Sequence, residues 1–137
     1  MKVISLLLPL FMLTSDKPYK IDFGTSTNRT TNWVILSDNV MGGLSEAQLK
    51  YETTSIIVKG FVSLENRGGF VSIKSTFGKV DLSQYKTVKI KFRSTSQKYS
   101  FTLENSRRWY EAAYKHDFKA KEINKWETVS LNLTDLP

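Results

Sequence analysis

Short segments in which apolar and polar residues alternate dominate this sequence, and turn-forming residues separate them about every ten residues. The clearest segment is TVKIKFR at 87–93, where Val88, Ile90 and Phe92 fall on one face and basic residues fall on the other. A period of two residues is that of a half-buried β-strand. Because no long segment shows the apolar stripe of an amphipathic helix, the chain is predicted to fold as an all-β sandwich or barrel.

The expected strands are short and are separated by segments rich in Gly, Asn, Asp and Ser. They are predicted at 19–23, 33–36, 55–64, 70–75, 87–93, 99–103, 109–114 and 126–133. A bend is expected at Gly60, and residues 45–52 fit either one helical turn or a strand.

The composition excludes several kinds of site. The 137 residues are enough for one domain with a core, and the absence of cysteine excludes a disulfide framework, a thiolate nucleophile and a cysteine-ligated metal. The single histidine, His116, provides no histidine cluster for a metal. The net charge of +7 favours encounter with anionic partners, although it also serves solubility alone.

Residues 1–15 have the layout of a secretory signal peptide, with Lys2, an apolar run and a small polar exit. The apolar run is too short to span a bilayer as a helix. Cleavage after Ser15 would leave one β-sandwich domain over 16–137, exported to the periplasm or to the outside of the cell. Without cleavage the localisation is undetermined, and the alternative is a buried N-terminal strand or helix.

The two loops that contain glycine doublets are candidate sites. The first loop comprises Asp38, Asn39, Met41, Gly42, Gly43 and Ser45. In a functional interpretation, the glycines let the backbone approach a ligand and Asp38 supplies a charged contact. In a structural interpretation, which the pattern favours, the glycines take positive φ, Asp38 bonds the loop backbone, and Val40 and Met41 pack into the core.

The second doublet follows at 64–73. Its loop comprises Glu65, Asn66, Gly68, Gly69 and Phe70. Glu65 and Asn66 could hydrogen-bond a sugar or peptide, but a hairpin turn or a bulge that needs glycine is the favoured interpretation.

An aromatic and basic segment is the best candidate for a ligand face. It comprises Arg107, Arg108, Trp109, Tyr110 and Tyr114. Aromatic rings stack on sugars and arginine pairs with carboxylates, whereas the alternative places one set of these rings in the core.

The basic stripe of Lys89, Lys91 and Arg93 is a solvated strand face by default. It lacks the interleaved aromatic residues of a nucleic-acid surface, so no nucleic-acid partner is predicted. At most, the stripe indicates contact with a polyanion or peripheral contact with a membrane.

Catalytic residues are not predicted, nor are cofactor-binding or metal-binding residues. The sequence has no G-x-S-x-G motif and has one histidine to serve as a base. A hydrolase with paired carboxylates is the least favoured hypothesis, since no spacing indicates it.

Six motifs in order resemble the complex I intermediate-associated protein 30 family over residues 19–137. They are DNVMGGLS (38–45), GFVSLENRGGFVSIKS (60–75), DLSQYKTVKIKFR (81–93), YSFTLE (99–104), YEAAYKHDFKA (110–120) and WETVSLNLTDL (126–136). Asn39 stands where the family more often has glycine, and Arg67 lies within the second glycine motif. The resemblance implies a jelly-roll β-sandwich of the galactose-binding-domain-like type, in a bacterial member that lacks the last strands of the family domain.

The resemblance also implies a non-enzymatic, protein-binding module, acting as an assembly factor or chaperone-like protein on a respiratory complex. Such a protein would show an exposed apolar patch or an open sheet edge. The alternative is a carbohydrate-binding module that uses an aromatic face. It would require at least two coplanar, exposed rings among Trp33, Trp109, Tyr110 and Tyr114.

Overall fold

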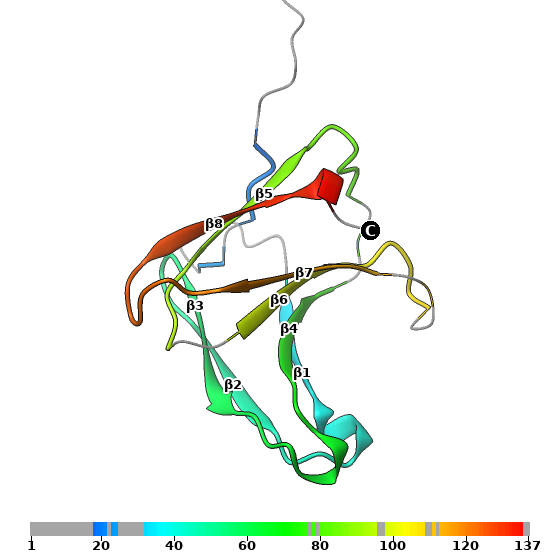
Figure 1. The fold of residues 1–137 in the computed structure, drawn as a ribbon, viewed down its shortest axis with the longest axis vertical. Helices are drawn as coiled ribbons and strands as arrows, with labels where there is room; N and C mark the ends of the chain where they lie inside the picture. Colours follow the sequence, from blue (N-terminus) through cyan, green and yellow to red (C-terminus); the bar gives the residue numbers. More distant parts are fainter. Residues whose placement is uncertain are drawn as a thin grey trace, which may run out of the picture. The chain divides into compact units, whose positions relative to one another are not determined.

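A computed structural model describes residues 18–21, 23–24, 32–76, 78, 80–95, 98–108, 111 and 113–135. Over these residues the chain forms eight strands in four antiparallel pairs and three short 3₁₀ turns, with no α-helix (Figure 1). The prediction of an all-β chain is confirmed. In the described residues, no helix has the length and apolar character needed to cross a membrane.

The chain divides into two compact units, of which the first ends at Thr76 and the second begins at Phe77. Residues 1–15, for which a signal peptide is predicted, lie outside the described residues.

Two strand pairs make up the first unit. They are β1 (Trp33–Ser37) with β4 (Val71–Ser75), and β2 (Glu46–Tyr51) with β3 (Ile56–Phe61). The 3₁₀ turn η1 (Asp38–Met41) follows β1, and η2 (Glu65–Arg67) follows β3. Residues 45–52 therefore supply a strand, which is one of the two structures that their sequence allows.

Tyr51 joins the two strand pairs of the first unit. Its hydroxyl donates to the carbonyl of Trp33 at 3.2 Å and lies 3.3 Å from the Trp33 amide. The Trp33 ring stacks on Phe23 with 5.0 Å between centroids. Gly60 is paired with Ala47 across β2 and β3, and an added Cβ would overlap the Glu46 carbonyl. The sequence thus needs glycine at 60 for close contact between strands.

The second unit also contains two strand pairs. They are β5 (Thr87–Phe92) with β8 (Glu127–Asn132), and β6 (Lys98–Leu103) with β7 (Tyr114–Lys119), and η3 (Leu133–Asp135) follows β8.

Aromatic side chains connect these two pairs. The Phe92 ring lies 5.2 Å from that of Phe118 and 6.2 Å from that of Tyr99, both edge-to-face, which is a favoured aromatic geometry. Leu131 on β8 is 2% exposed, and it is the one fully buried apolar side chain among the residues described.

Two predicted strands are wrong. Residues 18–21 and 23 form no strand, and the strand expected at 109–114 instead begins at Tyr114 and ends at Lys119. The aromatic residues of 109–114 have high β-propensity, but pairing with β6 decides the position. In that register His116 and Phe118, which are half-buried, lie opposite Phe101 and Tyr99.

Candidate functional site

The Asp38 carboxylate joins the two glycine loops. Asp38 begins η1 and is 0% exposed. Its Oδ1 accepts from the Ser45 amide at 2.9 Å, and its Oδ2 accepts from the Ser45 hydroxyl at 2.5 Å. The same Oδ2 accepts from the amides of Gly69 at 2.5 Å and Phe70 at 3.2 Å. One buried side chain therefore fixes two loops that lie about thirty residues apart in sequence.

Ser45 and two backbone contacts complete this arrangement, which we call the Asp38 clasp (Asp38, Ser45, Ser63, Gly69 and Phe70). The Ser45 hydroxyl accepts from the Ser63 amide at 3.0 Å, so the chain that leaves β3 is also held. The Asp38 amide donates to the Phe70 carbonyl at 3.3 Å. The structural interpretation of the sequence gives Asp38 this role, in which it bonds the loop backbone.

The pKa of Asp38 shows whether burial or hydrogen bonding has the larger effect on this carboxyl. Burial by itself would raise the pKa of this carboxyl, but the hydrogen bonds from Ser45, Gly69 and Phe70 outweigh burial and lower the pKa to about 2. Asp38 is therefore charged at neutral pH and engaged with donors from its own chain. A carboxylate in this state neither contacts a ligand in solvent nor serves as a general base near neutral pH.

The two glycines of each doublet have different structural roles. Gly42 (φ 85°) and Gly69 (φ 138°) adopt backbone conformations that other residues rarely take. Gly43 and Gly68 instead lie against the Asp38 carboxylate, where an added Cβ would overlap it. The expectation of positive φ is thus met at Gly42 and not at Gly43. The lack of a side chain at Gly43 and Gly68 therefore lets the backbone lie close to the Asp38 carboxylate.

The second loop is not a hairpin turn, because β3 and β4, which it connects, pair with different strands. Residues Glu65–Arg67 form η2 instead, with Asn66 at φ 53° and Arg67 at φ 61°. Glu65, Asn66 and Arg67 are all exposed, as is Asn39 in the first loop.

Apolar side chains project from the loops that the clasp joins. We call them the apolar loop surface: Val40, Met41, Leu44, Val62, Leu64 and Phe70. Val40 and Met41 are each 67% exposed and Leu64 is 81% exposed. The interpretation that places Val40 and Met41 in the core is therefore wrong, because η1 ends at left-handed Gly42 with both side chains in solvent. Figure 1 shows η1, in cyan, beside the green loop after β3.

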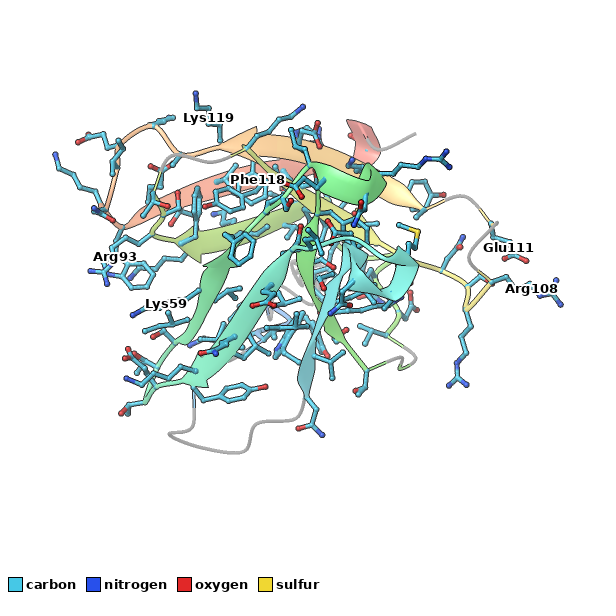
Figure 2. The ribbon with its side chains drawn as sticks, turned by 90° about the horizontal axis from the view of Figure 1, so that it is seen from below. Lys59, Arg93, Arg108, Glu111, Phe118 and Lys119 are labelled. Atoms are coloured by element: carbon cyan, nitrogen blue, oxygen red, sulfur yellow. The ribbon has the colours of Figure 1, made fainter. Side chains whose placement is uncertain are left out.

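The aromatic and basic segment is only partly described, since Trp109 and Tyr110 lie outside the described residues. Tyr114 begins β7 and is 39% exposed. Arg107 and Arg108 are exposed, and Arg108 Nη1 pairs with Glu111 Oε1 at 3.2 Å (Figure 2). Trp33, the other ring considered for a sugar platform, is half-buried on Phe23. Of the four rings considered for a sugar platform, Tyr114 is therefore the one that the structure describes as exposed.

The structure adds an aromatic residue to the basic stripe, which sequence reasoning missed. Trp126 directly precedes β8, and its ring centroid lies 5.7 Å from Lys91 Nζ and 5.3 Å from Arg93 Cζ. These distances are those of cation–π contacts. The pairing of β5 with β8 brings the residues together, and no local sequence pattern reports that register.

A second lowered pKa occurs on β7. The hydrogen bonds from Lys98 and Ser100, with the charges of Lys98 and Lys115, outweigh the opposing effect of burial and lower the pKa of Asp117 to about 2. Asp117 Oδ2 lies 2.7 Å from Lys98 Nζ. This is an exposed ion pair on one strand pair. The described residues contain no group of three His, Cys, Asp or Glu side chains that could hold a metal ion.

The match to known families covers the parts of the chain that the clasp joins. The model of the complex I intermediate-associated protein 30 family matches residues 21–137. The chain belongs to this family. Both glycine motifs that carry the resemblance lie within the match, so in this family member the Asp38 clasp links them. The searches of curated proteins and of solved structures found no match.

Proposed function

We propose that this chain is a non-enzymatic, protein-binding module whose partner docks on the apolar loop surface. The observation that carries the proposal is the exposure of large apolar side chains on the two loops that the buried Asp38 holds together. Exposed apolar groups gathered in one region mark interaction sites, whereas single ones are ordinary.

The clasp prepares this surface for binding. A loop that is already ordered loses less conformational entropy when a partner docks, so more of the interaction energy appears as affinity. Glycine-rich loops would be mobile without such bonds, but here hydrogen bonds from Ser45, Gly69 and Phe70 hold them. Met41 adds an adaptable apolar contact.

The partner that we propose is a subunit or assembly intermediate of a respiratory complex, in keeping with the family description as a complex I intermediate-associated protein. The chain would then act as an assembly factor or chaperone-like protein. The predicted signal peptide at 1–15 would export the domain, so subunits that face the outer side of the membrane are the first to search.

We also propose that residues 16–137 fold as a galactose-binding-like jelly-roll sandwich. The antiparallel pairing of strands distant in sequence, β1 with β4 and β5 with β8, supports this proposal.

Crosslinked pull-down from the native host, followed by mass spectrometry, tests the function. The variants are Met41→Ser and Leu64→Ser, and the matched control is Val58→Ser, which alters a 42% exposed apolar residue in the middle of β3. We expect respiratory-complex subunits with the unaltered chain and with Val58→Ser. Recovery should fall about tenfold with either loop variant, as for an interface residue of high energetic weight.

Two outcomes would reject the proposal. Recovery of envelope or surface-polysaccharide proteins without respiratory subunits would reject the assembly role and favour the carbohydrate-binding alternative. Equal loss of subunits with Val58→Ser and Leu64→Ser would show that the loops are not the docking surface.

A further inference from the structure

The turn before β8 is held in one conformation by its own hydrogen bonds. The Glu127 carboxylate accepts from the Lys121 amide at 3.0 and 3.1 Å and from the Glu122 amide at 3.3 Å. The Asn124 amide donates to the Ser94 carbonyl at 2.7 Å, and Asn124 has φ 58°. The turn is therefore fixed at both ends before any partner arrives.

This fixed turn presents two large apolar side chains to solvent. Ile123 is 60% exposed and Trp126 is 53% exposed. They lie three positions apart in sequence, at the end of the β5–β8 pair where Arg93 also lies. Figure 2 shows Arg93 at the opposite end of the second unit from Arg108 and Glu111.

Basic side chains lie beside the Trp126 ring and within the turn itself. Lys91 and Arg93 lie over or beside the Trp126 ring, and Lys89 is exposed on the same face of β5. Lys125 belongs to the turn itself, where it pairs with Glu122. On β8 the residues opposite Lys89 and Lys91 are Ser130 and Thr128, which carry no charge.

The carboxylates near the turn are already engaged within it. Glu122 is paired with Lys125, and Glu127 accepts backbone amide hydrogens. They therefore compete weakly with an external anion for Lys89, Lys91 and Arg93.

We propose that this Trp126 tip (Ile123, Trp126, Lys89, Lys91, Arg93 and Lys125) binds the surface of a bilayer that contains anionic phospholipids. The cations contact phosphate groups, while Ile123 and the Trp126 ring enter the head-group region. Tryptophan is enriched at that depth, and basic residues beside it add electrostatic attraction.

A lipid surface fits the tip better than a glycan or a nucleic-acid strand. A sugar or base needs a bare ring face on which to stack, whereas Lys91 and Arg93 lie at cation–π distance from the Trp126 ring. Neither polymer would cover the aliphatic side chain of Ile123. This inference concerns the second unit and does not depend on the apolar loop surface.

Vesicle flotation of the full chain tests the proposal. Vesicles of phosphatidylcholine alone are compared with vesicles in which about a third of the lipid is phosphatidylglycerol. We expect binding to the anionic vesicles, loss of binding at high salt, and a blue shift of tryptophan emission on binding.

Paired variants separate charge from apolar contact. Each basic residue near an anionic surface contributes about fivefold in binding, so Lys91→Gln with Arg93→Gln should weaken it by more than about tenfold. Trp126→Ala should weaken binding and reduce the blue shift. The matched control, Lys50→Gln with Lys59→Gln, removes the same charge from exposed positions on β2 and β3 and should leave most of the binding.

The proposal is overturned by absence of binding to anionic vesicles, by equal binding to neutral and anionic vesicles, or by equal losses in the two double variants. Tight binding to heparin or single-stranded DNA without vesicle binding would also overturn it and would identify a polyanion instead. Thermal unfolding followed by circular dichroism confirms that each variant is folded. If Lys91→Gln with Arg93→Gln fails this check, it is replaced by Lys91→Arg with Arg93→Lys, a charge-conserving variant that should retain vesicle binding.

Discussion

Replacing Gly68 by alanine should destabilise the chain strongly, although the added group is one methyl. Its Cβ would stand 2.6 Å from Asp38 Oδ2, 2.7 Å from the Ser63 carbonyl oxygen and 2.9 Å from the Glu65 carbonyl oxygen. Two of these atoms are backbone, so relief requires a shift of the loop, and the third belongs to the clasp. A shift that separates Asp38 from the amide of Gly69 removes a charge-assisted bond as well.

The expected magnitude follows from these contacts. Overpacking of a tight site costs about 1 to 3 kcal/mol, and each weakened hydrogen bond adds about 1 kcal/mol. We expect Gly68→Ala to lower the free energy of unfolding by about 3 kcal/mol. For a chain of this size, the urea midpoint should then fall by about 1 to 2 M.

Urea unfolding followed by circular dichroism provides the assay. The matched control is Gly78→Ala, since an added Cβ at Gly78 meets no atom within 4 Å. Gly42→Ala, which has open space but φ 85°, isolates the backbone effect and should cost about 1 kcal/mol. The reasoning fails if Gly68→Ala is no more destabilising than Gly78→Ala.

Two further predictions concern charge and burial. Asp38 and Asp117 have folded pKa values of about 2, below the usual value of about 3.9, so their contribution is fully present above about pH 4 and is lost as pH falls towards about 2. The urea midpoint of the unaltered chain should therefore fall as the pH is lowered through this range, and the midpoint of Asp117→Asn should fall less steeply. A midpoint that stays constant with pH would refute this explanation. Leu131→Ala should cost about 2 to 5 kcal/mol because the side chain is 2% exposed, whereas Leu64→Ala, at 81% exposed, should change stability by less than about 0.5 kcal/mol. Similar losses in both leucine variants, measured by thermal unfolding, would contradict the assigned burial.

Most strands could be predicted from sequence, and the strictly alternating segment 87–93 is the clearest of them. In 87–93 the inward set of Val88, Ile90 and Phe92 is half-buried along β5, as its period of two indicates. The segment 109–114 was misplaced because aromatic propensity is local, whereas β7 is positioned by its register with β6. Which strands pair, such as β5 with β8, is a long-range property that no local pattern reports.

The sequence marked four of the five clasp residues, Asp38, Ser45, Gly69 and Phe70, but neither Ser63 nor the geometry of the clasp. The spacing of the doublets marked both loops, and turn chemistry suggested that Asp38 bonds backbone amides. The amides it bonds include those of Gly69 and Phe70, more than thirty residues away, a contact that depends on the fold. Sequence reasoning placed Met41 inside because it is apolar, yet the turn at Gly42 leaves it in solvent.

Site-specific photocrosslinking in the native host tests whether a partner docks on the apolar loop surface. A photoreactive amino acid is placed at position 64 in the apolar loop surface and, as the control, at position 58 on β3. We expect crosslinks from position 64, but not from position 58, to a subunit or assembly intermediate of a respiratory complex. Crosslinks from both positions to the same proteins, or none from position 64, would contradict it.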